Sequence, residues 1–188
     1  RTEDFFRRRK TVILDRDGVL NRKPAQAHYV RRWAEFQWLP DALEALARLH
    51  QGGYRVVVVS NQAGIARGAM SEADLAEIHR IMKAEIEAAG GSVEAIYTCP
   101  HDWNAGCECR KPLPGMLYQA HRDLNLDLSR TYFVGDDERD REAADHAGCL
   151  FAKISPDRSL GEWVDEFLND QNTEDKEEHG KKSLDHGA

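Results

Sequence analysis

The chain has 188 residues, of which 41% are apolar, and a formal net charge of −7 from 26 basic and 33 acidic side chains. This length supports one hydrophobic core rather than two, so we expect a single domain. The negative charge argues against general binding to nucleic acid. The sequence has no apolar run of the about 18 residues that a membrane span needs, and no signal-like start. We therefore expect a soluble, cytoplasmic monomer without nucleic acid or membrane partners.

The first half of the chain predicts alternating strands and helices. Residues 11–14 and 54–59 are β-branched runs, which are typical of strands covered on both faces. Between them, residues 41–49 place leucines on one helical stripe and stop before Gly52-Gly53. A second helix is expected from Ser71, where a capping-box pattern begins, to about residue 86.

The second half continues the alternation. We expect a strand near residues 93–97, a helix opened by Pro114, a buried strand at 131–134 and an amphipathic helix at 160–168. This order predicts a single Rossmann-like, doubly wound α/β domain over residues 1–168. Residues 169–188 are polar with almost no apolar side chains, and we expect them to be a disordered tail.

Polar side chains follow the predicted strands at the points where the strands end. These side chains are Asp15, Ser60, Cys99 and, after Gly135, Asp136. Ligands bind beyond the carboxyl ends of the strands in open α/β sheets, so the acids should converge there. Asp15, Asp17 and Asp136 would repel one another without a cation, and carboxylates suit magnesium.

The same positions suggest a phosphoryl-transfer site. With magnesium present, Asp15 can attack phosphorus and form an aspartyl-phosphate. Asp17 lies close enough to protonate the leaving oxygen and then to activate water. Ser60 can donate to a phosphoryl oxygen, and Lys111 can balance the charge on the nucleophile and the transferred group.

An Asp-x-Asp pair by itself is a weak signal, because paired surface acids are common and glycosyltransferases use such pairs for divalent metals. The order of the motifs is far more specific. An apolar strand leads into Asp15-x-Asp17, another into Ser60-Asn61, then comes Lys111, and a further strand leads into Gly135-Asp136 with Asp140 following.

These residues resemble the four motifs of the haloacid dehalogenase superfamily of phosphatases. The resemblance covers about residues 11–150 and is closer still to the heptose 1,7-bisphosphate phosphatases and their histidinol-phosphatase relatives. Its strongest parts are Asp15-Arg16-Asp17-Gly18-Val19-Leu20-Asn21, Ser60-Asn61-Gln62-Ala63-Gly64-Ile65-Ala66-Arg67-Gly68 and Cys109-Arg110-Lys111-Pro112.

The resemblance implies a role for each matched residue. It implies Asp15 as the nucleophile, Asp17 as the general acid and base, and Asp136 as a magnesium ligand with them. It further implies that the phosphate is surrounded by Ser60, Asn61, Gln62, Arg110 and Lys111.

Three cysteines and a histidine crowd one loop, at Cys99, His101, Cys107 and Cys109. This set suits a closed tetrahedral zinc site, which would be structural and would hold the loop that carries Arg110 and Lys111. A redox pair at Cys107 and Cys109, or a nucleic-acid-binding zinc knuckle, would use the same thiols but would not explain His101 or the acidic balance. The resembled phosphatases have this loop too, which implies the same four zinc ligands.

The substrate class follows from the size of the domain and from the resemblance. No segment between the motifs is long enough for a large cap, so we expect an open, capless site for a small phosphorylated metabolite. The leading candidate is D-glycero-D-manno-heptose 1,7-bisphosphate, with loss of the C7 or C1 phosphate. Histidinol phosphate or another sugar phosphate is the alternative. The cysteine loop is short, as in the histidinol phosphatases, and Asp137 stands where heptose enzymes commonly carry a lysine that would attract phosphate.

A protein of another class would also fit part of the pattern. The chain could be a noncatalytic, zinc-stabilised binding domain that keeps the fold. The pair Asp15 and Asp17 at one strand end argues against it, since a binding module has no need of neighbouring carboxylates there. Residues 28–33, with His28 and Tyr29, are expected to be either a flap over the site or a solvated loop.

Overall fold

The computed structural model describes residues 10–184. In chain order, the described elements are β1 (Thr11–Leu14), the 3-10 helix η1 (Trp33–Glu35), α2 (Ala42–Gln51), β2 (Arg55–Asn61), α3 (Glu72–Ala88), β3 (Ala95–Cys99), α4 (Gly115–Leu124), the 3-10 helix η2 (Leu128–Arg130), β4 (Tyr132–Gly135), α5 (Glu138–Ala147), β5 (Leu150–Lys153) and α6 (Leu160–Leu184). The ends of the predicted domain and tail, residues 1–9 and 185–188, lie outside the described residues.

The strands form one five-stranded parallel sheet in the order β3-β2-β1-β4-β5. The α/β prediction is confirmed, and the strand β5 was missed. Its sequence is short, and Leu150 and Lys153 are exposed, so it lacks the buried β-branched pattern of the central strands. The central position of β1 brings its carboxyl end between those of β2 and β4.

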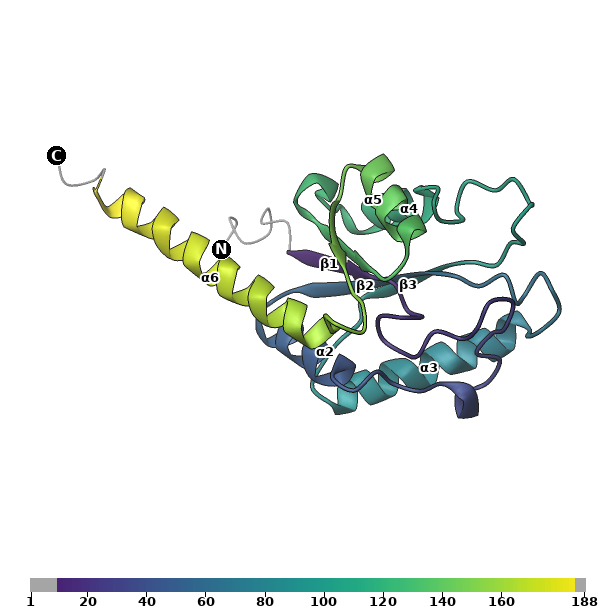
Figure 1. Ribbon diagram of the computed structural model, residues 1–188. Coiled ribbons are helices and arrows are strands. Elements are labelled where there is room, and N and C mark those ends of the chain that lie inside the picture. Colours follow the sequence, from purple (N-terminus) through teal and green to yellow (C-terminus); the bar gives the residue numbers. More distant parts are fainter. Residues whose placement is uncertain (1–9, 185–188) are drawn as a thin grey trace.

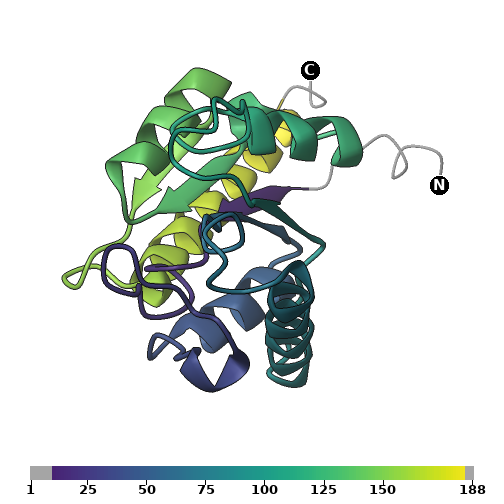
Figure 2. The same cartoon turned by 90° about the vertical axis from the view of Figure 1, so that its right-hand side faces the viewer.

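The two faces of the sheet are covered by different helices, as Figures 1 and 2 show. Val12 and Leu14 point to the layer of α2, α3 and α6, whereas Ile13 between them packs in the layer of α4 and α5. Alternate residues of a strand face opposite sides, so both faces of β1 must be apolar. All four residues of β1 are buried as a result.

Helix α6 begins as predicted but extends further. Trp163 stacks on Phe167 with ring centroids 4.9 Å apart, and both contact Tyr132 of β4 edge-on. The expected tail from residue 169 is instead helical up to Leu184, and Figure 1 shows this half of α6 running beyond the sheet. Local contacts such as that between Gln171 and Glu174 support this part of the helix, and they leave no apolar pattern in the sequence.

A helix needs both sufficient length and an apolar surface to span a membrane. None of the described helices, the 25-residue α6 included, is both long enough and apolar enough to cross a bilayer.

Removal of the Trp163 ring should destabilise the fold. The side chain is 4% exposed, so Trp163→Ala leaves a large cavity between α6 and the sheet. We expect the free energy of unfolding to fall by about 3–5 kcal/mol, measured by urea denaturation. The control Asp170→Ala changes an exposed residue of the same helix and should stay within about 0.5 kcal/mol. Equal stability of the two variants would contradict the packing of α6 into the core.

Candidate active site

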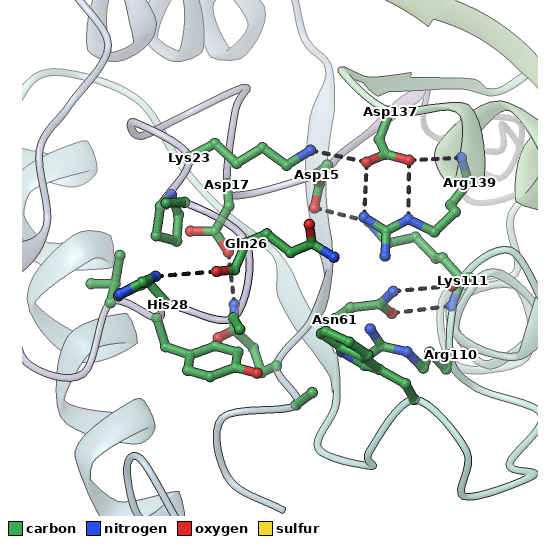
Figure 3. A pocket seen from close by; sticks show the side chains of 18 of the residues that line it. Asp15, Asp17, Lys23, Gln26, His28, Asn61, Arg110, Lys111, Asp137 and Arg139 are labelled. Carbon is green, nitrogen blue, oxygen red and sulfur yellow. Dashed lines mark hydrogen bonds and ion pairs between the residues drawn. The ribbon is translucent and has the colours of Figure 1, made fainter. Parts of the chain in front are cut away.

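The carboxyl ends of the central strands bring the predicted residues together. Asp15 directly follows β1, Asn61 is the last residue of β2, and Asp136 follows β4. Asp15, Asn61 and Asp137, the residue after Asp136, line one pocket of about 540 Å³, which Figure 3 shows from close by. The expected convergence at this edge of the sheet is therefore present.

Lys111 is buried between two carboxylates at the base of this pocket. Its Nζ lies 2.9 Å from Asp15 Oδ1 and 2.7 Å from Asp140 Oδ1, and only 4% of the residue is exposed. Burial acts to lower the pKa of Lys111, but the charges of Asp15 and Asp140 outweigh it and raise the pKa. Lys111 is therefore a permanent cation beside Asp15.

Asp15, Asp136 and Asp140 form a cluster whose carboxylate oxygens lie within 4.8 Å of one another. Burial, opposed by Lys111 and reinforced by Asp140 and Asp17, raises the pKa of Asp15 to about 8. Burial likewise raises the pKa of Asp136, against the effect of Lys23. A divalent cation would reverse both shifts, so the donor set fits a hard metal ion.

The neighbourhood of Asp136 supports this fit. Its Oδ1 is buried without a hydrogen-bond partner among the described residues, as expected of a ligand atom. The Asp136 carboxylate also lies against Gly18, where an added Cβ would come within 2.3 Å of Oδ2 and where φ is +93°. Only glycine allows the Asp15–Gly18 turn to approach Asp136 so closely.

The carboxylate of Asp17 does not join this cluster, although the sequence suggested it as a magnesium ligand. It accepts hydrogen bonds from Arg16 Nη2 at 3.0 Å, from Asn21 Nδ2 at 2.8 Å and from Gln62 Nε2 at 2.9 Å. Burial acts to raise the pKa of Asp17, but Arg16 and these donors outweigh it and lower the pKa. Asp140 takes the third place in the acidic cluster instead.

The residues after β2 have mixed positions. Ser60 is buried, and its Oγ accepts a hydrogen bond from Gln62 Nε2 at 2.8 Å. The Asn61 side chain forms two hydrogen bonds with the main chain of Lys111, one to its carbonyl oxygen and one from its N–H. Asn61 and Gln62 line the pocket, but their amides are engaged in holding Lys111 and Asp17.

Cationic side chains surround the mouth of the pocket. Arg110 lines it, and the Arg110 Nη1 atom is buried without a hydrogen-bond partner among the described residues. Asp137 accepts from Arg139 Nη2 at 2.8 Å and from Lys23 Nζ at 3.1 Å, as the dashed lines in Figure 3 mark. The hydrogen bond from Arg139 has the largest effect on the pKa of Asp137. Together with Lys23 it holds this pKa well below its usual range.

The suggested flap, residues 28–33, lies only partly at this mouth, where His28, Tyr29 and Val30 line the pocket. The segment of residues 23–30 lines the pocket and also contributes to a neighbouring one of about 760 Å³. Tyr29 packs against Gly64, where a Cβ would come within 2.8 Å of its ring. The segment is thus a wall between the two pockets and is fixed against the loop after β2.

The four predicted zinc ligands converge on one point. Cys99 Sγ lies 3.1 Å from Cys109 Sγ and 3.6 Å from Cys107 Sγ, and His101 Nδ1 lies 3.2 Å from Cys109 Sγ. Tetrahedral zinc with bonds of about 2.3 Å would separate its sulfur ligands by about 3.8 Å, so the donor set is close to this size. Burial and the two neighbouring thiols raise the pKa of Cys109 to about 12, which a bound cation would oppose.

Sequence reasoning missed several residues of the site. The sequence places Asp140 after the last motif but assigns it no role. Asp137 and Asp140 have the spacing of a capping box, which could have indicated that a helix begins there. The contact of Lys23 with Asp136 joins residues 113 positions apart, and that of Arg16 with His79 joins residues 63 apart. Neither pair leaves a local pattern in the sequence.

Comparison with known proteins places this geometry in a family. A family model described as "Polynucleotide kinase 3 phosphatase" matches residues 10–177. The D-glycero-beta-D-manno-heptose-1,7-bisphosphate 7-phosphatase of Bordetella bronchiseptica is 45% identical over 140 residues, which are 74% of this chain and 77% of the relative. The protein of the same name from Rhodopseudomonas palustris is 36% identical over 168 residues, 86% of this chain and 89% of the relative.

Solved structures agree with the sequence relatives. The crystal structure of D,D-heptose 1,7-bisphosphate phosphatase from B. bronchiseptica, complexed with magnesium and phosphate, matches with a TM-score of 0.78 and 36% identity, and covers 86% of this chain and 99% of that one. The enzyme of the same name from Burkholderia thailandensis has a TM-score of 0.62 and 29% identity, and covers 85% and 98%. The chain therefore belongs to the haloacid dehalogenase-type phosphatases, in the family of the heptose 1,7-bisphosphate 7-phosphatases.

Proposed function

We propose that the chain is a magnesium-dependent phosphomonoesterase that removes the 7-phosphate of D-glycero-D-manno-heptose 1,7-bisphosphate. The observation that carries the proposal is Asp15, buried at the end of β1 beside Lys111 and the carboxylates of Asp136 and Asp140. The names of the curated relatives support the substrate and the position of the phosphate.

Asp15 and Asp136 are the residues that we assign to magnesium. Asp140 has both oxygens engaged, with Oδ1 on Lys111 and Oδ2 accepting the main-chain N–H groups of Asp136 and Asp137. It therefore positions Lys111 and the turn after β4. The bound ion would supply positive charge to the phosphoryl oxygens and to Asp15, which would keep Asp15 ionised.

The reaction then follows from the residues around Asp15. Asp15 Oδ1 accepts hydrogen bonds from Arg16 N and Lys111 Nζ, and this leaves Oδ2 for attack on phosphorus. The new bond joins Oδ2 to phosphorus as the ester P–O bond breaks. The electron pair passes to the leaving oxygen, which takes a proton from Asp17.

Hydrolysis of the aspartyl-phosphate reverses the part played by Asp17. Asp17 takes a proton from water, the water oxygen bonds to phosphorus, and the P–O bond to Asp15 breaks with its electron pair returning to the carboxylate. The donors around Asp17 favour its ionised form, which suits this second step. A bound phosphate adds negative charge beside Asp17 and acts in the opposite direction, which suits the first step.

The surroundings of Asp137 support a substrate with two phosphates. Asp137 stands where a lysine would attract phosphate, but it is paired with both Arg139 and Lys23. With Arg110, the mouth of the pocket has three cationic side chains, and the single negative charge of Asp137 does not neutralise all of them. A second phosphate would find partners there, whereas a monophosphate such as histidinol phosphate would not need them. The pocket of about 540 Å³, lined mostly by polar and charged residues, and the net charge of −7 favour such a metabolite over a polynucleotide.

Replacement of the nucleophile should abolish activity. Asp15→Asn should lower magnesium-dependent hydrolysis of 4-nitrophenyl phosphate by at least about 10³-fold, because an amide cannot form the covalent intermediate. Phosphate release is the measurement, and the exposed Asp157→Asn serves as the control that should keep full activity. Undiminished hydrolysis by the Asp15 variant would remove Asp15 as the nucleophile.

Arg139 should contribute more to a bisphosphate than to a simple ester. We expect Arg139→Gln to raise KM for heptose 1,7-bisphosphate about 10-fold, because one charge-assisted phosphate contact is lost, and to change KM for 4-nitrophenyl phosphate by less than about 2-fold. Arg141→Gln, two residues further on α5 and paired with Glu138, is the matched control. An equal rise for both esters, or a strong preference of the wild type for histidinol phosphate, would contradict the assignment.

We assign a structural zinc ion to Cys99, His101, Cys107 and Cys109. Elemental analysis of the purified protein should find about one zinc per chain, as a single four-ligand site requires. Cys109→Ser should lose the metal and, because Lys111 follows two residues later, much of kcat. Cys149→Ser, a half-buried cysteine outside the cluster, should keep both. A zinc-free protein with full activity would overturn the assignment.

A further inference from the structure

Arg16 is fully buried although it lies between the two catalytic aspartates. Its Nε and Nη2 both donate to Asp17, at 3.3 Å and 3.0 Å from Oδ1, and Nη2 also lies 3.2 Å from Oδ2. A guanidinium is planar and only donates hydrogen bonds. Its orientation therefore acts together with the donors Asn21 and Gln62 to set the position and plane of the Asp17 carboxylate.

The other end of the guanidinium contacts His79 of α3. Arg16 Nη1 lies 3.1 Å from His79 Nε2, and since arginine only donates, Nε2 must be the unprotonated acceptor. Burial and the charge of Arg16 lower the pKa of His79 to about 3, so the ring is neutral. The flanking side chains Ile78 and Met82 are fully buried and hold this part of α3 against the core.

A neutral acceptor at this point has a particular advantage. A carboxylate at position 79 would also orient Arg16, but it would share the positive charge that now acts on Asp17. An imidazole orients the guanidinium without neutralising it. The full charge of Arg16 thus remains directed at Asp17.

We propose that Arg16 and His79 are positioning residues for proton transfer by Asp17, with His79 acting through Arg16 from outside the pocket. The inference rests on the proposed role of Asp17. The path runs from the core of α3 through His79 Nε2 and the Arg16 guanidinium to the Asp17 carboxylate. Loss of the acceptor at residue 79 allows Arg16 to turn and moves Asp17 away from the leaving oxygen.

Two aryl phosphates that differ in leaving group test this role. Phenyl phosphate needs a proton on its leaving oxygen, whereas 4-nitrophenolate leaves readily as an anion. His79→Leu should lower kcat/KM for phenyl phosphate about 10-fold and that for 4-nitrophenyl phosphate by less than about 2-fold. His79→Gln, whose Oε1 reaches the place of Nε2, should restore phenyl phosphate hydrolysis. His79→Asn is one methylene shorter and should behave like the leucine variant.

Two control variants make the result decisive. Lys83→Leu, one turn further along α3, should leave both esters unchanged. Asp17→Asn must itself show a loss that is larger for phenyl phosphate; if it does not, the proposed role of Asp17 fails and the inference fails with it. If Asp17→Asn shows that loss but the leucine and asparagine variants of His79 lose both esters equally, or neither, the positioning role alone is overturned. Should His79→Leu not fold, the glutamine and asparagine pair gives the same comparison.

Discussion

The buried ion group of Asp15, Lys111 and Asp140 is the interaction on which the site depends. Charges removed from water are costly unless their geometry satisfies them, and here each charged group has partners within 3 Å. The arrangement requires β1 and α5 to supply one acid each, and it requires the cysteine loop to deliver the lysine. The parallel order of the sheet, with β1 between β2 and β4, makes this meeting possible.

The two aspartates of the first motif occupy different electrostatic environments although they are two residues apart. Asp15 shares Lys111 with another acid, and burial raises its pKa to about 8. Asp17 has Arg16, Asn21 and Gln62 as donors, and its pKa is lowered. Neighbouring carboxylates with separated pKa values are able to take different parts in one reaction. At Asp15 the negative charges of Asp140 and Asp17 add to the effect of burial and outweigh Lys111, whereas at Asp17 the charge of Arg16 and the amide donors outweigh burial.

The central strands and the motif residues at their ends could be predicted from the sequence, because both depend on local patterns. A buried β-branched run such as residues 56–59 is visible without any partner. The missed parts depend on contacts between distant segments or on weak patterns. Strand β5 is an edge with exposed residues, and His79 is one of several polar residues on α3 until Arg16 is placed beside it. The effect of the Asp137 charge on a substrate phosphate depends on its ion pairs with Lys23 and Arg139, and the sequence does not reveal the contact with Lys23.

The side-chain amide of Asn61 has a consequence for the catalytic cycle. It contacts the peptide groups on both sides of Lys111 as a neighbouring strand would, and its own backbone is paired with Cys99 in the sheet. A free lysine side chain and its main chain have considerable conformational entropy. Because this pairing and the two ion pairs order Lys111 when the protein folds, that entropy is lost once, and it does not have to be lost again each time a substrate reaches the transition state.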